Sequence, residues 1–368
     1  MKPIDMKAVK YFIVYFIAVQ LLLPYAFSLS DVYSNRMDYK LMLDNNNMHD
    51  IDAVLQQVKR DIDRNDRSDY IVMLGDSVFY GSPGSSNQAV NVFLQQKPGA
   101  PTIYNLSFPA MQIGDFYTML LKLDKFGIST DKLLFNIRYA SFIPRDPYPR
   151  SVFWLGEHLR VLDRAAYERV LPQLKSSDFK TPDDPYKFFQ RALHEEWLPQ
   201  LSLMRYKDYF RQNLNHAWLN FTNRPIPDDA LDDSRAWYIK KEWQESQGLN
   251  YNEFLQDPLL VASFTDKPFD LTDNNIDAYF LNKIIERQQG KKTWIVLSGT
   301  NHDLMGSSVE KPGYKANLDA IGRMMADKPV TYINLEGVIE GDFFSDHTHF
   351  TPEGNAKLAD VLWPYLNQ

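Results

Sequence analysis

A serine, an aspartate and a histidine in two short segments of this chain have the types and surroundings needed for nucleophilic catalysis. Ser77 ends the segment YIVMLGDS, whose apolar run predicts a buried strand and whose Gly-Asp-Ser predicts the turn after it. A serine hydroxyl is a weak nucleophile and needs a base within hydrogen-bond reach. In SDHTHF, Asp346 and His349 are three residues apart, so the carboxylate can orient the imidazole that accepts the serine proton. Each segment alone is equally typical of a polar turn.

The elements that must position these residues are predicted by short apolar runs that alternate with helix-like stretches. We expect strands at 70–74, 102–106, 132–137, 293–298 and 330–334, and helices at 86–97, 113–127, 273–289, 314–326 and 352–366. Thr351 and Pro352 are typical of a helix start. This alternation predicts βαβ units on a parallel sheet, where ligands bind beyond the carboxyl ends of the strands. Ser77 follows the first strand at that edge.

The two segments together resemble the SGNH (GDSL-type) hydrolase family. Its first block is matched by Gly75-Asp76-Ser77, and its last block, Asp-x-x-His before the terminal helix, by Asp346-His347-Thr348-His349. The resemblance covers about 70–140 and 290–368. It implies an α/β, three-layer flavodoxin-like fold with a central parallel sheet, in which Ser77, Asp346 and His349 are catalytic and His347 is structural.

Two blocks of this family depart from their usual form here. NLSFPA supplies Asn105 of the second block but has Ala110 where glycine is usual, and the backbone N–H of Ala110 can still serve an oxyanion. The family's Gly-x-Asn is missing after the third predicted strand. Gly299-Thr300-Asn301 follows the fourth instead, which makes Asn301 a candidate side-chain donor to the oxyanion.

A metal-dependent phosphoesterase is the alternative chemistry. TNHD (300–303) and DHTH (346–349) look like two histidine motifs of calcineurin-like metallophosphoesterases, with Asp76, His302 and Asp303 as further possible ligands. That family also needs an early Asp-x-His, and His49 in NMHD does not follow a strand. Half of the dinuclear site would be missing, so we predict no metal site and no cofactor.

The N-terminus predicts a membrane anchor. Lys2, Lys7 and Lys10 precede an uncharged stretch at 11–28, whose length as a helix is roughly 27 Å and close to the hydrocarbon thickness of a bilayer. Lysines before the span place the N-terminus in the cytoplasm and the rest outside. A cleaved signal peptide ending at 26–28 is the alternative, but its apolar region would be unusually long.

The remaining chain divides by composition. We expect an anchor at 1–30, a helical connector at 31–69, a catalytic domain at 70–140 and 261–368, and a mostly helical insertion at 141–260. The insertion holds Trp154, Trp197, Trp218, Trp237 and Trp243, which form either its own core or a surface that stacks on sugar or acyl groups. The net charge of −7 offers no basic surface for nucleic acid, and the absence of cysteine excludes disulfides and thiolate-metal sites.

Membrane-tethered SGNH proteins with helical additions resemble acyltransferases that modify cell-envelope polysaccharides. The resemblance therefore implies a single-pass, extracytoplasmic serine O-acyltransferase that acetylates an envelope glycan and takes the acyl group from a membrane-embedded acyl-donor protein. Alternatives are a tethered esterase or deacylase, D-alanyl transfer to teichoic acid, and an inactive glycan-binding relative. The sequence leaves the acyl group, the acceptor and the oligomeric state open.

Overall fold

The computed structural model describes residues 6–143, 153–173 and 185–368, which divide into two compact units. One unit comprises the described residues of 1–67 and 180–227, and the other those of 68–179 and 228–368. The sheet and all predicted site residues belong to the second, which we call the sheet unit. The first, which we call the helical unit, contains the N-terminal helix.

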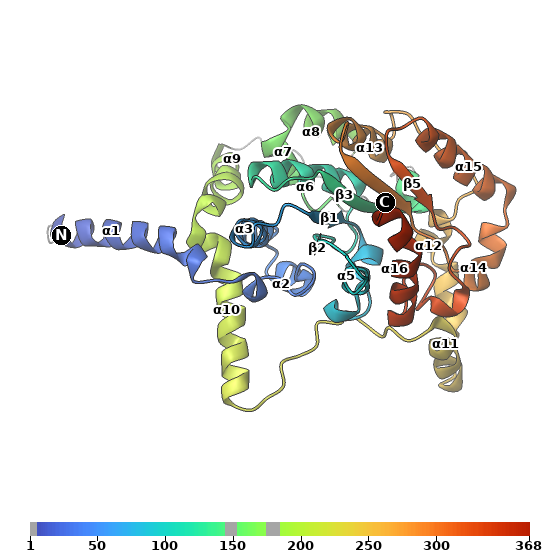
Figure 1. The fold of residues 1–368 in the computed structure, drawn as a ribbon, viewed down its shortest axis with the longest axis horizontal. Helices are drawn as coiled ribbons and strands as arrows, with labels where there is room; N and C mark the ends of the chain where they lie inside the picture. The colour runs from blue at the N-terminus through green and yellow to red at the C-terminus, as the bar shows by residue number, and fades with distance from the viewer. Residues whose placement is uncertain (1–5, 144–152, 174–184) are drawn as a thin grey trace. The chain divides into compact units, whose positions relative to one another are not determined.

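A parallel five-stranded sheet organises the sheet unit, as the sequence predicts (Figure 1). Its strands are β1 (Tyr70–Leu74), β2 (Thr102–Asn105), β3 (Lys132–Ile137), β4 (Lys292–Leu297) and β5 (Thr331–Asn334). Their order is β2-β1-β3-β4-β5, which is the order of flavodoxin-like doubly wound sheets. In this order the chain leaves β1 toward β2 on one side and reaches β3 on the other. The switch point of the topology therefore lies between β1 and β3, directly beside Ser77.

Helices cover both faces of this sheet (Figure 1). The sheet unit contains α4 (Ser77–Tyr80), α5 (Val90–Gln95), α6 (Ile113–Lys125), α7 (Gly156–Leu162), α8 (Arg164–Val170), α11 (Trp237–Ser246), α12 (Pro258–Ser263), α13 (Ile276–Arg287), α14 (His302–Val309), α15 (Pro312–Ala326) and α16 (Pro352–Leu366). Helices α5 and α16 pack together on one face, and α6 and α13 on the other. The predicted helices are confirmed except that α5 is shorter than 86–97, and neither α4 nor α14 was predicted.

The core of the sheet unit follows from strand alternation. Ile71 and Met73 of β1 are buried in one cluster with Leu94 of α5 and Leu358 of α16. The last helix begins where its sequence predicts, because the Thr351 hydroxyl accepts a hydrogen bond from the backbone N–H of the third helical residue at 3.0 Å. This cap fixes the start of α16 directly after the loop that carries Asp346 and His349.

The helical unit consists of α1 (Met6–Leu22), α2 (Tyr39–Asp44), α3 (Asp50–Arg64), α9 (Pro185–Ala192) and α10 (Ser202–Phe221). The segment Met6–Tyr25 is long and apolar enough to span a membrane, and no residue of α1 is buried. The described part of 141–260 contains helices and no strand, as expected. The helices of this segment belong to both units, however. Helices α9 and α10 lie in the helical unit, and α7, α8 and α11 lie in the sheet unit. The predicted domain boundaries stay a prediction.

Candidate active site

Ser77 is the first residue of a one-turn helix that directly follows β1. The turn between them is tight, since a Cβ atom on Gly75 would collide with the side chains of Asn136 and Phe79. Gly81 ends the helix with φ of +82°, in the left-handed region that favours glycine. The segment GDSVFYG is therefore built so that its serine leaves the sheet at the carboxyl edge. Ser77 is partly exposed there, while its neighbours in the segment are buried.

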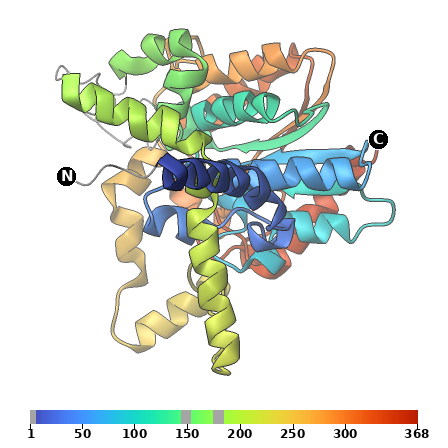
Figure 2. The same cartoon turned by 90° about the vertical axis from the view of Figure 1, so that its left-hand side faces the viewer.

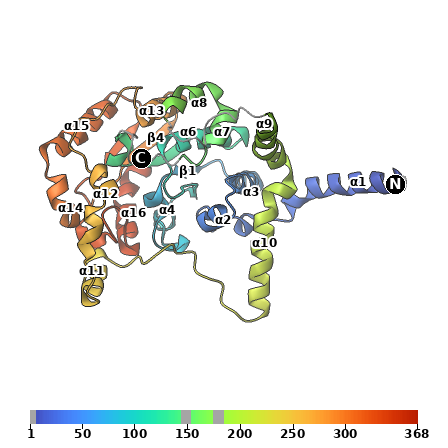
Figure 3. The ribbon, with the colours of Figure 1, turned by 180° about the vertical axis from the view of Figure 1, so that it is seen from behind.

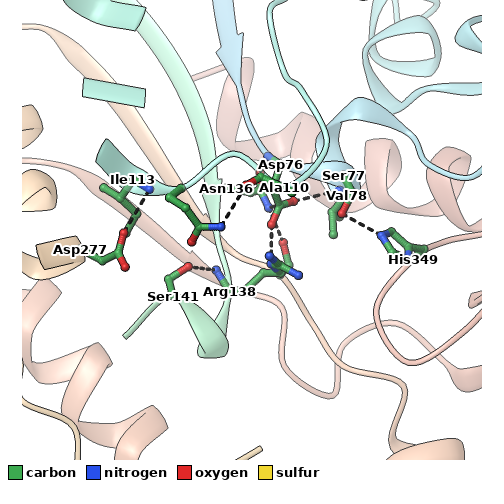
Figure 4. Close-up of polar contacts among 12 residues, drawn as sticks. Asp76, Ser77, Val78, Ala110, Ile113, Asn136, Arg138, Ser141, Asp277 and His349 are labelled. Atoms are coloured by element: carbon green, nitrogen blue, oxygen red, sulfur yellow. Dashed lines mark hydrogen bonds and ion pairs between the residues drawn. The ribbon is translucent and has the colours of Figure 1, made fainter. Parts of the chain in front are cut away.

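Asp76 shapes this turn rather than reacting. One carboxylate oxygen accepts hydrogen bonds from the backbone N–H of Val78 at 2.9 Å and from Asn136 Nδ2 at 3.0 Å. The other oxygen forms an ion pair with Arg138 (Figure 4). Asp76 thus caps the short helix that carries Ser77 and has its charge balanced by a cation from β3's end.

Asn136 is the residue that sequence reasoning missed. Its amide oxygen accepts the backbone N–H of Asp76 at 3.2 Å, and its Nδ2 also donates to Ser298 Oγ at 3.0 Å. One buried amide thereby ties together the ends of β1, β3 and β4. The available signal was an asparagine near the end of an otherwise apolar strand, because a buried polar side chain needs specific partners.

The structure brings Ser77, His349 and Asp346 together, although 268 residues separate the serine from the next of them in the numbering. His349 Nε2 lies 2.8 Å from Ser77 Oγ (Figure 4), and His349 Nδ1 lies 2.7 Å from Asp346 Oδ2. The second oxygen of Asp346 accepts the backbone N–H groups of Thr348 and His349, each at 2.8 Å. The loop itself orients the carboxylate, and the carboxylate orients the imidazole.

Electrostatics assign different protonation to the two histidines of this loop. Burial opposes the charge of Asp346, but the imidazoles and hydrogen bonds around it hold the pKa of this carboxyl well below its usual range. Burial also opposes the charge of His349, yet the neighbouring Asp346 raises the pKa of His349 above 6.5. Burial lowers the pKa of His347 to about 4. The imidazolium is therefore stabilised at His349, while His347 is neutral at neutral pH.

Ala110 lies at the end of the loop that follows β2. Phe108 N–H donates to the Gly75 carbonyl at 3.0 Å, so this loop runs beside the serine turn. The indole N–H of Trp154 donates to the carbonyl of Pro109 at 2.9 Å. Ala110 has φ of +62°, a conformation in which a non-glycine residue is uncommon. A glycine would adopt this conformation without a steric penalty, whereas Ala110 adopts it with some backbone strain.

Asn301 is buried, and both the nitrogen and the oxygen of its side-chain amide form hydrogen bonds. Its Nδ2 donates to the backbone carbonyl of Asp346 at 3.1 Å, and its Oδ1 accepts the Leu304 N–H at 3.2 Å as the N-cap of α14. The backbone N–H of Asn301 donates to the His347 carbonyl at 3.0 Å. In this arrangement Asn301 holds the loop that presents Asp346. Its role as an oxyanion donor stays a prediction.

The residues of the alternative metal chemistry do not form one metal-binding group among the described residues. His302 and Asp303 begin α14, and His302 Nε2 lies 2.8 Å from Glu336 Oε1, whose hydrogen bond raises the pKa of His302. His49 Nε2 lies 2.9 Å from Glu195 Oε2 in the helical unit. In the part of the chain that the structure describes, no three His, Asp or Glu side chains are grouped to hold a metal ion.

The segment around α11 borders the catalytic loop. Trp237 donates its backbone N–H to the Phe344 carbonyl at 2.9 Å and its indole N–H to the Gly341 carbonyl at 3.1 Å. Burial, with the nearby charge of Asp346, raises the pKa of Tyr251 to about 12. The chain after α10 therefore returns to the sheet edge and forms one wall beside the loop of Asp346.

The other tryptophans of 141–260 do not form a common core. Trp154 packs edge-on against Phe108 at 5.7 Å between ring centroids, next to the loop of Ala110. Trp197, Trp218 and Trp243 are exposed over more than half of their surface, at 57%, 59% and 53%. The core interpretation is wrong for these three, whereas Trp154 and Trp237 fasten loops of the candidate site.

A comparison with models of known protein families finds no match to this chain, and neither does a comparison with curated protein sequences. The resemblance to SGNH proteins rests on the Gly-Asp-Ser and Asp-x-x-His segments, and it stays a prediction. The geometry establishes that His349 is hydrogen-bonded to both Ser77 and Asp346, and that the three residues lie at the switch point of a doubly wound sheet.

Proposed function

We propose that this protein is a membrane-anchored, extracytoplasmic serine acyltransferase of the SGNH type that O-acetylates an envelope glycan. The supporting observation is the relay in which Ser77 Oγ lies 2.8 Å from His349 Nε2 and His349 Nδ1 lies 2.7 Å from Asp346 Oδ2. Both distances suit proton transfer from a hydroxyl to an oriented imidazole. The raised pKa of His349 fits a base that must hold this proton during the reaction.

In the first step, Ser77 Oγ attacks the carbonyl carbon of an acyl donor while its proton passes to His349 Nε2. The tetrahedral intermediate collapses, the bond to the donor oxygen breaks, and His349 returns the proton to that oxygen. In the second step, an acceptor hydroxyl gives its proton to His349 and attacks the acyl-serine, and Ser77 regains a proton as it leaves. Asp346 stays ionised throughout and stabilises the imidazolium.

The oxyanion formed in each step needs donors near Ser77. We assign this task to the backbone N–H groups of Ser77, at the start of α4, and of Ala110, in the loop beside it. Each such donor contributes on the order of 10²–10³-fold to the rate in other acyl-transfer enzymes. Asn301 then acts by positioning, since its amide already binds the Asp346 loop.

Transfer to a glycan is preferred to hydrolysis because of the anchor. Lys2, Lys7 and Lys10 precede the uncharged stretch that begins at residue 11, inside the segment Met6–Tyr25, and this order predicts the N-terminus in the cytoplasm and the sheet unit outside. There the acceptor is an envelope polysaccharide, and a membrane-embedded protein supplies the acyl group, as in the acyltransferases that this chain resembles. This step of the proposal rests on analogy between folds.

The test uses the full chain in lipid nanodiscs with p-nitrophenyl acetate as donor. Release of p-nitrophenol is compared with and without oligosaccharide acceptors, and mass spectrometry of the acceptors detects acetylation. Ser77→Ala is compared with Ser107→Ala, because Ser107 follows β2 at the same edge of the sheet but is fully buried, whereas Ser77 is partly exposed. Ser77→Ala should lose turnover by on the order of 10³-fold or more, whereas Ser107→Ala should retain it.

Acetylated acceptor that forms only with an intact Ser77 supports transfer. Release of acetate alone, with no acetylated acceptor, would favour the tethered esterase. Full activity of Ser77→Ala would overturn the assignment of the nucleophile.

A further inference from the structure

The outer face of α10 in the helical unit is apolar. Leu203, Phe210, Leu214, Trp218 and Phe221 are spaced by seven, four, four and three residues, which places them on one stripe of the helix. All five are exposed, and the exposed fractions reach 62% at Leu214 and 79% at Phe221. We call this set the α10 stripe. Lys207 interrupts this stripe between Leu203 and Phe210, and from Phe210 onward the exposed face is apolar, as at interaction surfaces.

The opposite face of α10 is the one that packs inside the helical unit. Tyr206 and Tyr209 are fully buried, and the hydroxyl of Tyr206 accepts a hydrogen bond from Gln57 Nε2 of α3 at 2.7 Å. Gln212 Nε2 donates to Asp38 Oδ2, the N-cap residue of α2, at 2.6 Å. The packed face of α10 thus contains hydrogen-bonded hydroxyl and amide groups, while the large apolar side chains of the α10 stripe lie on the exposed side.

The α10 stripe begins where α1 ends. The backbone N–H of Leu203 donates to Gln20 Oε1 at 3.2 Å, close to the carboxyl end of the apolar segment. Helix α10 runs crosswise to α1, and α1 extends away from α2 and α3 (Figures 1 and 3). Figure 2, which looks along α1, shows α10 passing across its end. Because the inward face of α10 lies against α2 and α3, the stripe faces the side toward which α1 extends.

Charge and aromatic content on this face suit a headgroup layer. Lys207 lies within the stripe between Leu203 and Phe210, and Arg211 borders it; their side chains are 46% and 67% exposed. The rings of Trp218 and Phe221 lie together at 5.9 Å between centroids. Tryptophan and phenylalanine beside basic residues are typical of helices that lie in the membrane interface, where the rings enter the acyl boundary and the cations meet anionic headgroups.

We propose that the α10 stripe lies in the interface of the bilayer that α1 spans. The lipid surface then covers the stripe. It lies close to Leu203 because Leu203 contacts Gln20 of α1, the helix that spans the bilayer. With α1 along the membrane normal and α10 in the membrane plane, the helical unit has two non-parallel attachments and therefore one fixed orientation. This inference rests on the anchor of the proposed function but not on its catalytic chemistry.

The experiment uses the absence of native cysteine. Single cysteines replace Leu214 in the stripe, Val14 in the middle of α1, and Trp243 in α11 as a control of similar exposure in the sheet unit. Each full-length variant is labelled with an environment-sensitive fluorophore and reconstituted into phosphatidylcholine–phosphatidylglycerol vesicles. Quenching by shallow spin-labelled lipids and by aqueous iodide is then measured for each label.

We expect the label at Leu214→Cys to be quenched by spin-labelled lipid and protected from iodide. A Leu214→Cys label that iodide reaches as readily as the Trp243→Cys label would overturn the inference. Protection from iodide without lipid quenching would also overturn it, and would indicate a protein partner on the stripe. If the Val14→Cys label is not quenched by lipid, the anchor itself fails, which separates that failure from one of the stripe alone.

Discussion

At the carboxyl edge of the sheet, the side chains of Asp76, Asn136 and Asn301 are buried although they are polar. On the outer face of α10, Leu214 and Phe221 are exposed although they are apolar. Both regions depart from the usual distribution of residue types, but in opposite directions. At the sheet edge every one of these polar groups has hydrogen-bond partners inside the sheet unit. The α10 stripe has its apolar surface turned outward.

The difference separates two kinds of functional surface. Burial of a polar group costs free energy unless hydrogen bonds replace those to water, so the sheet edge is a self-contained site whose geometry is set in advance. An exposed apolar face gains free energy only when something outside the chain covers it. The first region is thus a site whose polar groups are satisfied within the sheet unit, and the second is a surface that something outside the chain can cover.

Among the predicted changes in activity or stability, we expect the largest from Asp346→Asn at the sheet edge. The amide cannot stabilise the imidazolium and favours the wrong tautomer of His349, so kcat with p-nitrophenyl acetate should fall on the order of 10⁴-fold. Asp342→Asn, an exposed aspartate four residues earlier, is the matched control and should be neutral. Retention of most activity in Asp346→Asn would mean that the carboxylate does not serve the histidine.

The pH dependence of the same site gives the second prediction. Only neutral His349 can accept the serine proton, and Asp346 raises the pKa of His349 above 6.5. In the wild type, kcat/KM should therefore fall as the pH drops through a value above 6.5. In Asp346→Asn the raising charge is gone while burial still lowers the pKa of His349, so this limb should move to lower pH. A limb that does not move would assign the titration to another group.

Asn301→Ala tests whether the buried network positions the loop. Removal of the amide leaves the Asp346 carbonyl and the Leu304 N–H without their partners, which should lower the free energy of unfolding by about 1–3 kcal/mol in urea. Asn274→Ala, at an exposed asparagine, should change it little. A loss of kcat on the order of 10²-fold or more at unchanged stability would instead favour Asn301 as an oxyanion donor.

The smallest effect is expected on the α10 stripe. Phe221→Ser should change the free energy of unfolding in detergent by less than about 0.5 kcal/mol, because an exposed ring loses little on truncation. Tyr209→Ser on the inward face of the same helix should cost about 3–5 kcal/mol by leaving a cavity. If Phe221→Ser is as costly as Tyr209→Ser, the stripe contributes to the fold and the comparison between the two regions fails.

Much of the sheet unit was predictable because its signals are local. The runs at 70–74 and 132–137 coincide with β1 and β3, and the start of α16 follows from Thr351 and Pro352. The relay was also predictable, since Asp346 and His349 lie in one turn and Ser77 follows a strand at the edge where parallel strands end together. Strand periodicity and capping depend on neighbours within a few residues, and a single sequence contains that information.

The sequence by itself therefore determined the sheet, its last helix, the apolar N-terminal segment and the three residues of the relay. The tertiary structure decided that Asn136 and Arg138 hold Asp76, that Asn301 holds the Asp346 loop, and that α10 turns its apolar face outward. Those outcomes depend on which side chains meet after strands 60 or more residues apart are paired. Helical periodicity shows that a helix has an apolar face, but only packing decides whether that face meets the core or the surroundings.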